Sequence, residues 1–411
     1  MDRYIKRHLE FAIERAEKMF AALLISGARQ TGKTRLLRER YPRLPYVTLD
    51  DPVQHQEAVN NPGGFFETHV PPVVVDEIQY APELFRYIKM IADGVHDGKR
   101  KKGFFFMSGS QQYVLMKNVS ESLAGRIGIL NLLGLSRREI EGIDFRLPFL
   151  PSPDYFAERK SSVSPSNSKD IWEAILKGCL PELQNPDTDR ELFYSAYVKT
   201  YIERDVRQLV NIGDELAFLK FMTAMAARTG QLLNYTSIAQ DIGLSVSTIE
   251  RWVSILRASN IIYLLQPYHT NMLKRAIRTP KLYFLDTGLV CYLSGWNTAT
   301  VLERGAAAGA IFETYCIAEI IKSYTNTGRE PPLYFYRDKE QHEIDVLIAE
   351  NGTLYPLEIK KHASPRPEDL HAFRYIENIP GTIRGPGGLI CLYPSLTSLG
   401  EKDKVIPLGY V

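Results

Sequence analysis

The stretch Gly27-Ala28-Arg29-Gln30-Thr31-Gly32-Lys33-Thr34 has the spacing G-x-x-x-x-G-K-[ST]. An apolar run at residues 21–25 precedes it, and a helix-compatible run at residues 35–40 follows it. A strand, a glycine-rich turn and a helix N-terminus in this order form a phosphate cradle, because the backbone amides and the helix dipole face the anion. The stretch therefore predicts a nucleotide-binding loop. The alternative is a surface turn that happens to contain Gly-Lys-Thr.

The chemistry of this loop gives a role to each fixed position. Gly27 and Gly32 let the backbone approach the anion closely, and the amides of the loop then point at the phosphates. Lys33 is expected to reach the β- and γ-phosphates, and the Thr34 hydroxyl is expected to hold Mg²⁺. We therefore expect all eight residues of the stretch to line the nucleotide.

A second landmark is the run Val-Val-Val-Asp-Glu at residues 73–77. Consecutive β-branched residues predict a strand buried on both faces, and hence a parallel sheet. Ligands bind at the carboxyl ends of such strands, where these two carboxylates stand. We expect Asp76 to hold Mg²⁺ and Glu77 to polarise an attacking water. The alternative is an ordinary helix cap, since acidic residues also begin helices.

Two further candidates follow along the chain. The strand predicted at residues 103–107 ends in two serines, and we expect Ser110, with Ser108 as the second choice, to sense the γ-phosphate. Arg126 precedes an apolar run at residues 127–130 and could stabilise transition-state charge, in cis or from a neighbouring subunit. The alternatives are a strand-end turn for the serines and a surface or structural ion pair for the arginine.

The composition bounds the class of protein. An apolar content of 45% and a charged content of 24% are those of ordinary globular domains, and 411 residues are enough for two or three of them. The net charge is only +2, so the whole chain gives no argument for nucleic acid or membrane as a partner. The 4 cysteines lie far apart, which argues against a zinc site or a disulfide framework. A signal-peptide core is not expected at the N-terminus, and no apolar run approaches the roughly 20 residues that span a bilayer, so we expect a cytoplasmic protein.

The middle of the chain is predicted to be helical after a linker. Residues 146–170 are rich in Pro and Ser, which predicts a linker or a mobile surface loop. In the helical stretch at residues 193–207, Arg204 and Asp205 could contact the nucleotide or a neighbouring subunit. A salt bridge within the helix is the alternative.

Residues 231–266 have the pattern of a helix-turn-helix followed by a wing strand. Gly243 ends the first helix and Ser245 caps the second. If DNA binds, these residues would face a groove: Ser247, Thr248 and Arg251. The most basic neighbouring segment contains Lys274, Arg275 and Arg278, which could meet the phosphate backbone or lie in a solvated loop. The alternative for the whole pattern is a packing or oligomerisation module, because the second helix is not notably basic.

A separate group of charged residues lies near the C-terminus. Glu358 and Lys360 are two positions apart in a predicted strand and therefore share one face. Asn351-Gly352 predicts a hairpin turn that brings Asp345 beside them, and Glu313 on the preceding helix could be a fourth member. Two carboxylates can bind a hard cation such as Mg²⁺, and a neighbouring lysine can activate water for phosphodiester cleavage. The alternative is a set of charges on the solvated face of a sheet.

The order of these motifs, together with Asp-Asp-Pro at 50–52 and Leu-Ser-Arg-Arg-Glu at 135–139, resembles the prokaryotic AAA+-type ATPases paired with a C-terminal domain of unknown function. The resemblance extends over nearly the whole chain. It implies ATP as the nucleotide and a Mg²⁺-dependent core, and it does not define the physiological task. The order Asp, hairpin, Glu-x-Lys is similar to the PD-(D/E)XK nuclease core of restriction-endonuclease-like domains, although no Pro precedes Asp345.

We therefore expect an α/β protein with a P-loop parallel-sheet ATPase domain at residues 1–145, a linker at 146–170, a helical lid and winged-helix region at 171–270, and a PD-(D/E)XK-like domain at 271–411. The first hypothesis is an ATPase whose nucleotide cycle drives conformational change in the attached domains. The second is a DNA-associated effector whose ATPase gates a C-terminal nuclease. The third is a non-catalytic scaffold that uses ATP as a switch. A homo-oligomer or a partner protein is compatible with each.

Overall fold

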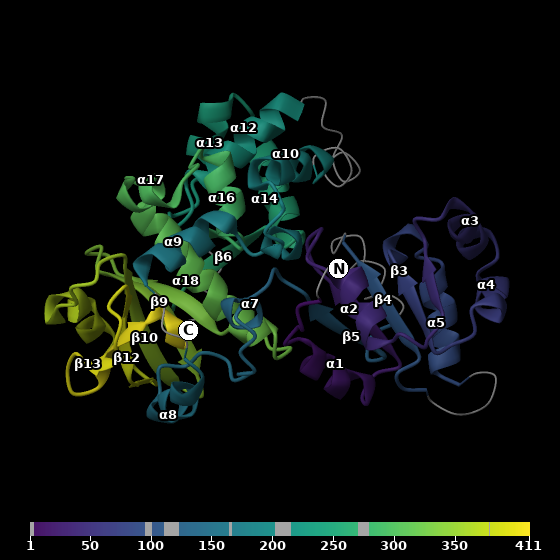
Figure 1. Ribbon diagram of the computed structural model, residues 1–411, viewed down its shortest axis with the longest axis horizontal. Coiled ribbons are helices and arrows are strands. Elements are labelled where there is room, and N and C mark those ends of the chain that lie inside the picture. Colours follow the sequence, from purple (N-terminus) through teal and green to yellow (C-terminus); the bar gives the residue numbers. More distant parts are fainter. Residues whose placement is uncertain are drawn as a thin grey trace.

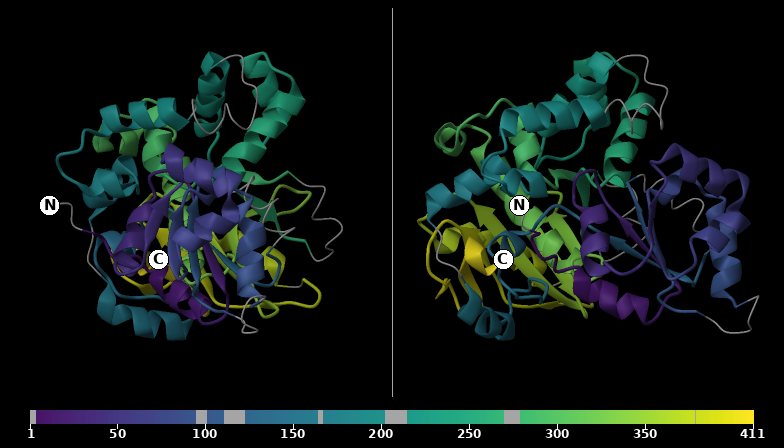
Figure 2. Two further views of the ribbon diagram at one scale, coloured as in Figure 1. Left: turned by 90° about the vertical axis from the view of Figure 1, so that its right-hand side faces the viewer. Right: turned by 45° about the vertical axis from the view of Figure 1, so that its right-hand side comes forward.

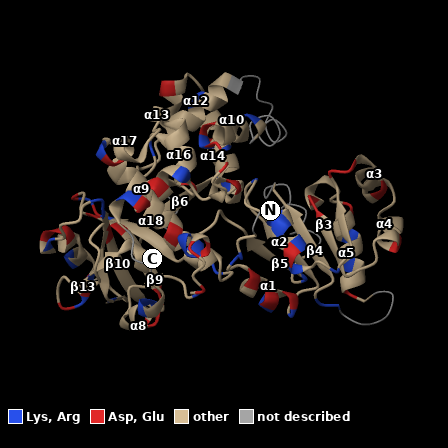
Figure 3. Cartoon of the chain, viewed as in Figure 1, with Lys and Arg blue, Asp and Glu red and all other residues tan. Residues whose placement is uncertain are grey.

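The computed structural model describes residues 4–94, 101–110, 123–163, 167–201, 215–269, 279–377 and 379–411. Figure 1 shows an N-terminal α/β unit on one side, a helical region above, and a C-terminal unit built on a second sheet on the other side. In Figures 1 and 2 the N-terminal unit adjoins the C-terminal unit on the side of its first helix. Basic and acidic residues are interspersed over the described elements rather than gathered on one of them, as Figure 3 shows.

The N-terminal unit is built on a five-stranded sheet with the order β2-β3-β4-β1-β5. Every pairing in it is parallel, which confirms the predicted P-loop type of sheet. Strands β1, β3 and β4 are buried along their whole length, as continuous apolar runs require. The strands are β1 (Ala22–Ser26), β2 (Tyr46–Thr48), β3 (Val73–Asp76), β4 (Phe105–Gly109) and β5 (Ile127–Asn131), and the helices are α1 (Glu10–Glu17), α2 (Lys33–Arg40), α3 (Pro52–Asn60), α4 (Pro62–Thr68) and α5 (Leu84–Ala92).

The helical middle contains the predicted pair of helices. Helix α13 ends at Gly243, whose φ of +77° is the left-handed conformation that glycine adopts most easily. Helix α14 begins after Ser245, whose hydroxyl accepts from the backbone N–H of Thr248 at 3.2 Å. The helices of this region are α9 (Ser168–Lys177), α10 (Arg190–Tyr201), α12 (Glu215–Ala226), α13 (Tyr235–Ile242) and α14 (Val246–Ala258).

The segment at residues 146–170 is not the mobile surface loop that its composition predicts. Its described part forms α8 (Pro153–Arg159), with Ser152 as the N-cap and Pro153 in the first turn. Phe149, Tyr155 and Phe156 are buried, and the Tyr155 hydroxyl donates to the Tyr410 carbonyl at 2.7 Å. Ser and Pro therefore begin a helix here, and the aromatic residues fasten the segment to the end of the chain.

The C-terminal unit is built on a nine-stranded mixed sheet with the order β13-β14-β12-β10-β9-β8-β6-β7, in which β11 pairs with β10. Asn351 and Gly352 join β9 to β10 with φ values of +51° and +77°, which is the predicted hairpin turn. The strands are β6 (Ile262–Pro267), β7 (Lys281–Phe284), β8 (Leu333–Arg337), β9 (Glu343–Glu350), β10 (Thr353–Lys360), β11 (Ile383–Arg384), β12 (Gly387–Cys391), β13 (Thr397–Ser398) and β14 (Asp403–Pro407). The helices of this unit are α16 (Thr287–Leu293), α17 (Ala299–Arg304) and α18 (Ala308–Thr325). The short helix α7 (Arg137–Ile140) follows β5, the last strand of the first sheet, along the chain.

The middle and the C-terminal unit share one hydrophobic core. Strand β6 pairs with β7 on one side and with β8 on the other, so the predicted wing strand is also a strand of the C-terminal sheet. One cluster of buried residues includes Phe218 and Trp252 of the middle together with Phe312 and Ile359 of the C-terminal unit. A domain boundary between residues 270 and 271 would therefore cut a hairpin and a common core.

No helix in the described ranges is long and apolar enough to cross a membrane. All four cysteines are buried and free.

Candidate functional site

The glycine-rich loop joins the end of β1 to the beginning of α2, at the carboxyl edge of the parallel sheet. A Cβ atom at Gly27 would overlap the carbonyl oxygen of Leu132, so only glycine fits there without a shift of the loop. Gly32 has a φ of +90° and stands at the N-terminus of α2. The first amides of a helix have no partner within the helix, so this end of α2 can receive an anion.

The two residues at the start of α2 face different partners. Lys33 is 6% exposed, and its Nζ donates to the carbonyl oxygens of Gly27 at 3.0 Å and Ala28 at 2.8 Å. The Thr34 hydroxyl donates to Asp76 Oδ2 at 2.9 Å. Thr34 and Asp76 come from α2 and β3, yet their oxygens are adjacent, which is the arrangement that a shared cation requires.

Two hydroxyls that hold Asp76 complete this corner of the site. The Tyr46 hydroxyl donates to Asp76 Oδ2 at 2.8 Å, and burial together with the charge of Asp76 raises the pKa of Tyr46. The Ser108 hydroxyl donates to Asp76 Oδ1. Sequence reasoning missed Tyr46, although its place at the start of the strand beside β3 was a usable signal.

Glu77 follows β3 with a φ of +55°, a conformation that is uncommon for residues other than glycine. Its backbone N–H donates to Ser108 Oγ at 3.3 Å, and the Ser110 hydroxyl donates to its Oε2 at 3.4 Å. Gln79 also donates to this carboxylate, a contact that sequence reasoning missed. Ser110 is therefore near Glu77 and Ser108 near Asp76, because β4 lies between β1 and β3.

Arg126 lies at the other end of the sheet. It immediately precedes β5, whose first residue pairs with Ala22 and whose last residue pairs with Ser26 beside the loop. Four residue steps along a strand separate these ends by about 13 Å. The guanidinium pairs with Asp93 at 2.5 Å. Arg126 therefore does not fit the role in cis that we considered, because strand direction carries it away from the loop, and a role from a neighbouring subunit stays a prediction.

A cavity of about 530 Å³ adjoins the loop. Thr31, Gly32 and Arg35 form one wall, and Pro181, Glu182 and Phe193 of the middle region form another. Tyr4, Ile5 and Arg7 of the N-terminal segment also line it. The space next to the phosphate cradle is therefore lined by residues from three parts of the chain.

The C-terminal charged residues also come together. Lys360 Nζ lies 2.9 Å from Glu358 Oε2 and 3.3 Å from Asp345 Oδ2, and Asp345 also accepts from the Ile359 N–H at 2.9 Å. Asp345 and Glu358 are 7% and 5% exposed, so they do not lie on a solvated face of the sheet. Glu358 Oε1 is buried and makes no hydrogen bond within the described residues.

Glu313 joins this group through two residues that sequence reasoning missed. Its carboxylate accepts from the Tyr283 hydroxyl at 2.5 Å and lies 3.6 Å from Lys281 Nζ. Lys281 also pairs with Glu343 at 2.6 Å. Tyr283 and Lys281 lie on β7, and their sequence context had not pointed to the cluster. We refer to Glu313, Asp345, Glu358 and Lys360 as the acidic cluster.

Burial and mutual repulsion give these carboxyls different pKa values. Burial, followed by the charge of Asp345, raises the pKa of Glu313 to about 7 and that of Glu358 well above its usual range. Burial also acts to raise the pKa of Asp345, but the charges of Lys360 and Lys281 outweigh it and lower that pKa. Carboxyls that share a charge in this way are suited to binding a cation.

The residues that we predicted to face DNA lie in the first turns of α14. Ser247 and Arg251 are exposed on α14, and the hydroxyls of Ser247 and Thr248 lie 3.0 and 2.8 Å from the hydroxyl of the capping residue Ser245. The residues outside the described ranges are Arg204, Asp205, Lys274, Arg275 and Arg278.

Comparison with family models divides the chain into three parts. Residues 20–141 match an AAA domain. Residues 168–300 and 308–411 each match a domain of unknown function, DUF8612 and DUF4143. The first match identifies an AAA-type ATPase domain, which is an ATP-binding P-loop domain and agrees with the parallel sheet and the loop.

Relatives and solved structures were also found. Uncharacterized proteins of Mycobacterium tuberculosis and Mycobacterium bovis are each 27% identical to this chain over 370 residues, which cover 88% of it and 75% of the relative. The Walker-type ATPase PABY2304 of Pyrococcus abyssi is similar with 15% identity and a TM-score of 0.43, covering 70% of this chain and 94% of that chain. The Holliday junction branch migration motor RuvB of Thermotoga maritima has 15% identity and a TM-score of 0.30, covering 62% of this chain and 87% of that chain.

Proposed function

We propose that the N-terminal unit is a Mg²⁺-dependent ATP hydrolase. The observation that carries the proposal is the direct contact between Thr34 on α2 and Asp76 on β3, at 2.9 Å, beside the glycine-rich loop. The two oxygens that Mg²⁺ requires are thus adjacent at the point where the phosphates would lie. The AAA-domain match at residues 20–141 supports ATP as the nucleotide.

The residues around the loop fit ATP and its metal ion. Gly27 and Gly32 supply the close backbone approach, Lys33 would contact the β- and γ-phosphates, and Thr34 with Asp76 would hold Mg²⁺. When bound, the metal neutralises charge on the phosphates. Glu77 takes the proton of the attacking water, and its left-handed backbone turn and the contact with Ser110 orient its carboxylate.

The cavity of about 530 Å³ next to the loop supports a binding position for the nucleoside. Apolar side chains such as Ile5 and Phe193 would cover the base, while Arg35 and Glu182 offer polar groups. Since the N-terminal segment and the middle region both line this cavity, the bound nucleoside would contact both. Nucleotide exchange would then change how these parts of the chain pack.

Steady-state ATP turnover tests the proposal. We expect Lys33→Ala to lower kcat/KM by about 100-fold, because an electrostatic donor to the transferred phosphoryl group is lost. Glu77→Gln is expected to abolish turnover and keep ATP binding. Lys18→Ala, a change to an exposed residue of α1 that pairs with Glu14, is the control that should leave turnover unchanged.

Full turnover in Lys33→Ala would overturn the proposed hydrolase. The scaffold hypothesis makes a different prediction. It expects tight ATP binding without turnover in the wild type, and then Glu77→Gln changes little.

A second candidate function is metal-dependent cleavage of phosphodiesters by the C-terminal unit, gated by the ATPase. The acidic cluster favours it, because three largely buried carboxyls and the partly exposed Lys360 come together from α18, β9 and β10. The order of elements also supports it, with helix α18 before the meander β8-β9-β10 and strand β12 parallel to β10. This is the arrangement that the resemblance to PD-(D/E)XK nucleases implies.

The acidic cluster fits a hard cation. The unpartnered Glu358 Oε1 offers a buried acceptor, and Asp345 stays ionised beside it. Asp345 and Glu358 would hold the cation, Glu313 would contribute through its ionised form, and Lys360 would orient the attacking water. A bound divalent cation supplies charge for the leaving phosphate oxygen.

Incubation of plasmid DNA with the full chain and Mg²⁺, with and without ATP, tests this candidate. Wild type should convert supercoiled plasmid to open forms, and Asp345→Ala should abolish the conversion. Glu350→Ala changes a carboxylate at the far end of the same strand, where it pairs with Arg329, and is the matched control. Unchanged plasmid with Mg²⁺ or Mn²⁺ would argue against cleavage. Binding of DNA through the winged-helix region would show separately as weaker binding by Arg251→Ala.

A further inference from the structure

Arg7 joins the phosphate-binding loop to the segment that leaves the sheet after β5. Its side chain is 3% exposed, and its guanidinium donates to three acceptors that lie on two segments. Nη1 donates to the Thr31 carbonyl at 2.8 Å, Nη2 to the Leu133 carbonyl at 2.7 Å, and Nε to the Glu139 carboxylate at 3.1 Å. A guanidinium is a rigid planar fork, so a shift of one acceptor disturbs the bonds to the other two.

The bond to Thr31 affects the phosphate cradle itself. Thr31 and Gly32 share one peptide unit at the N-terminus of α2. Because the C=O and N–H of a trans peptide point in opposite directions, holding the Thr31 carbonyl toward Arg7 turns the Gly32 amide away from Arg7. The amide side of this peptide can bind phosphate, and its carbonyl side is bound by Arg7.

Residues 133–139, the junction segment, continue from Arg7 toward the C-terminal unit. Glu139 is buried and accepts from the backbone N–H groups of Ser136 and His8, each at 2.7 Å, as well as from Arg7. The Ser136 hydroxyl and Glu139 form a capping box at the start of α7. Glu139 lies in α7, so a change in the bond between Arg7 and Glu139 would reach this helix.

A second buried ion pair connects the junction segment to α18. The Arg137 N–H donates to Glu319 Oε2 at 2.8 Å, and Lys322 Nζ donates to the Leu135 carbonyl at 3.1 Å. Lys322 and Glu319 also pair with each other at 2.8 Å. Side-chain exposures of 2% and 6% mean that breaking either contact would leave a buried charge without its partner.

Helix α18 also carries a member of the acidic cluster. Glu313 lies six residues before Glu319, which is about 9 Å along the helix axis. Fourteen of the 18 residues of α18 are buried, so the helix moves as one body against its neighbours. A shift at Glu319 therefore displaces Glu313 relative to Asp345 on β9.

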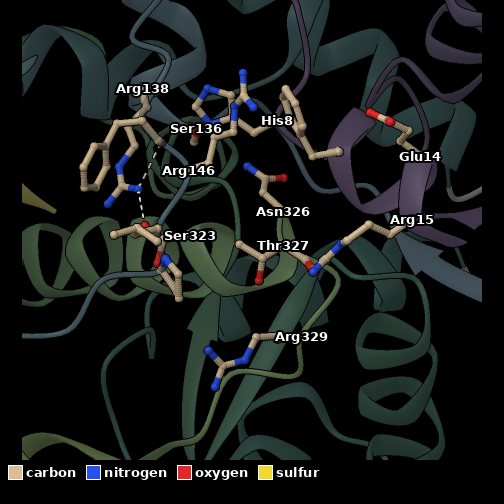
Figure 4. A pocket seen from close by; sticks show the side chains of 14 residues that line it. His8, Glu14, Arg15, Ser136, Arg138, Arg146, Ser323, Asn326, Thr327 and Arg329 are labelled. Atoms are coloured by element: carbon tan, nitrogen blue, oxygen red, sulfur yellow. Dashed lines mark hydrogen bonds between the residues drawn. The ribbon is translucent and has the colours of Figure 1, made fainter. Parts of the chain in front are cut away.

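The far end of α18 has room for such a shift. A cavity of about 450 Å³ lies beside this end of the helix and is lined by residues of α1, of the stretch 136–148 and of the stretch 323–329. In Figure 4 the Arg15 side chain is directed toward Thr327. Helix α1 contacts the chain just beyond α18, where Arg15 donates to the Thr327 carbonyl at 2.6 Å and a Cβ atom on Gly328 would lie 3.2 Å from Ala12 Cβ, so the free space lies beside these contacts. A cavity removes packing contacts, so a small rotation costs less here than in a filled core.

We propose that Arg7 is a positioning residue that couples nucleotide binding at the loop to the position of α18 and hence to the acidic cluster. Phosphate at the Gly32 amide turns the peptide that Arg7 holds, Arg7 moves the junction segment, and Glu319 with Lys322 moves α18. The inference rests on the proposed binding of ATP to the loop. It does not require the acidic cluster to cleave DNA.

Hydrogen exchange of the full chain tests the coupling. Exchange of the amides at residues 308–325 is measured with and without ATP and Mg²⁺, and ATP binding is measured in parallel by equilibrium dialysis. Wild type should bind ATP and change its exchange in α18. Glu319→Gln should bind ATP with an affinity within about twofold of wild type and lose the α18 response, because its change lies at the far end of the network.

Arg7→Lys tests the near end, and it keeps a positive charge beside Glu139. A lysine cannot reach three acceptors at once, so ATP affinity should fall by up to about tenfold and the α18 response should fall with ATP saturating. Arg15→Ala is the matched control. Arg15 also joins the N-terminal unit to the C-terminal unit, through its bond to the Thr327 carbonyl, but it does not bond to the phosphate-binding loop. This variant should keep the full response.

The outcomes separate the inference from the function on which it rests. A full α18 response in ATP-bound Glu319→Gln and Arg7→Lys would overturn the coupling. The same holds for a wild type that binds ATP and shows no change in α18. A wild type that binds no ATP would overturn the proposed function and the inference together.

Discussion

At the scale of residues, the two candidate sites solve the problem of buried charge differently. Asp76 is surrounded by hydroxyls from Thr34, Tyr46 and Ser108, which satisfy its oxygens by hydrogen bonds. The acidic cluster instead places carboxyls against one another, and lysines compensate only part of the charge. The charge balance of the acidic cluster therefore depends on the protonation of Glu313 and Glu358.

The pH dependence of stability follows from Glu313. Its pKa is raised from 4.5 to about 7, so the folded protein holds this proton more tightly than the unfolded chain. The stability that this contributes is complete below the unfolded pKa and is lost as pH rises through the folded pKa, by up to about 3 kcal/mol. The charged and titratable groups that face Glu313 are Lys281, Tyr283, Asp345 and Lys360.

Urea unfolding between pH 5 and pH 8, in the presence of a chelator, checks this prediction. Wild type should lose stability relative to Glu313→Gln as the pH rises, because the amide does not ionise. Parallel curves for the two proteins would show that Glu313 does not titrate in this range.

Sequence reasoning identified the residues of the candidate nucleotide site because their spacing is local. Lys33 and Thr34 follow a fixed pattern, and Asp76 stands at the end of an apolar run, so short windows of sequence are sufficient. Arg7 and Lys281 were missed because nothing in their own windows distinguishes them from surface residues. Their partners lie 132 and 32 residues away, at Glu139 and Glu313, and only the fold brings them together.

At the scale of elements, β1, the loop and α2 form a unit that could be predicted from the sequence. The linker at residues 146–170 could not, because Pro and Ser are equally common in loops and at helix N-termini. Ser152 and Pro153 begin α8, and the burial of Tyr155 depends on contacts with the last residues of the chain. Composition alone does not contain that information.

Gly27→Ala tests the close packing of the loop. The added methyl would overlap the Leu132 carbonyl, so we expect a loss of about 1–3 kcal/mol in the free energy of unfolding and a clear loss of ATP affinity. Gly309→Ala is the control, because its Cβ would meet nothing within 4 Å and α18 favours alanine. Equal ATP affinity in both variants, measured by equilibrium dialysis, would contradict this account of the loop.

At the scale of the whole molecule, the chain is less modular than its motifs suggest. The middle and C-terminal unit share a core, and the β6–β7 hairpin joins them. The N-terminal unit has two cores of its own, and it meets the rest through Ala28 and Leu133 of the shared core and through polar contacts of the junction segment. Long-range packing of this kind has no periodic signal in the sequence, which is why a boundary at residue 270 was predicted.

Arg126 gives a prediction about assembly. Because it lies about 16 Å along the sheet from the loop end of β5, we expect it to act only on a neighbouring subunit. Lys33→Ala and Arg126→Ala should each be inactive alone, and mixing them should restore part of the ATP turnover, since some interfaces then contain one intact site. Full turnover in Arg126→Ala would contradict this prediction and would show that Arg126 serves only in the ion pair with Asp93.

The central claim is that Thr34 and Asp76 form the metal corner of an ATP-hydrolysing site, and Mg²⁺-dependent ATP turnover tests it most directly. Wild type should hydrolyse ATP only with Mg²⁺, and Asp76→Asn should lower turnover by about 100-fold and require more Mg²⁺. Asp51→Asn, which follows the neighbouring strand and keeps its helix-capping oxygen, should behave as wild type. Wild-type turnover in Asp76→Asn at the same Mg²⁺ concentration would contradict the account.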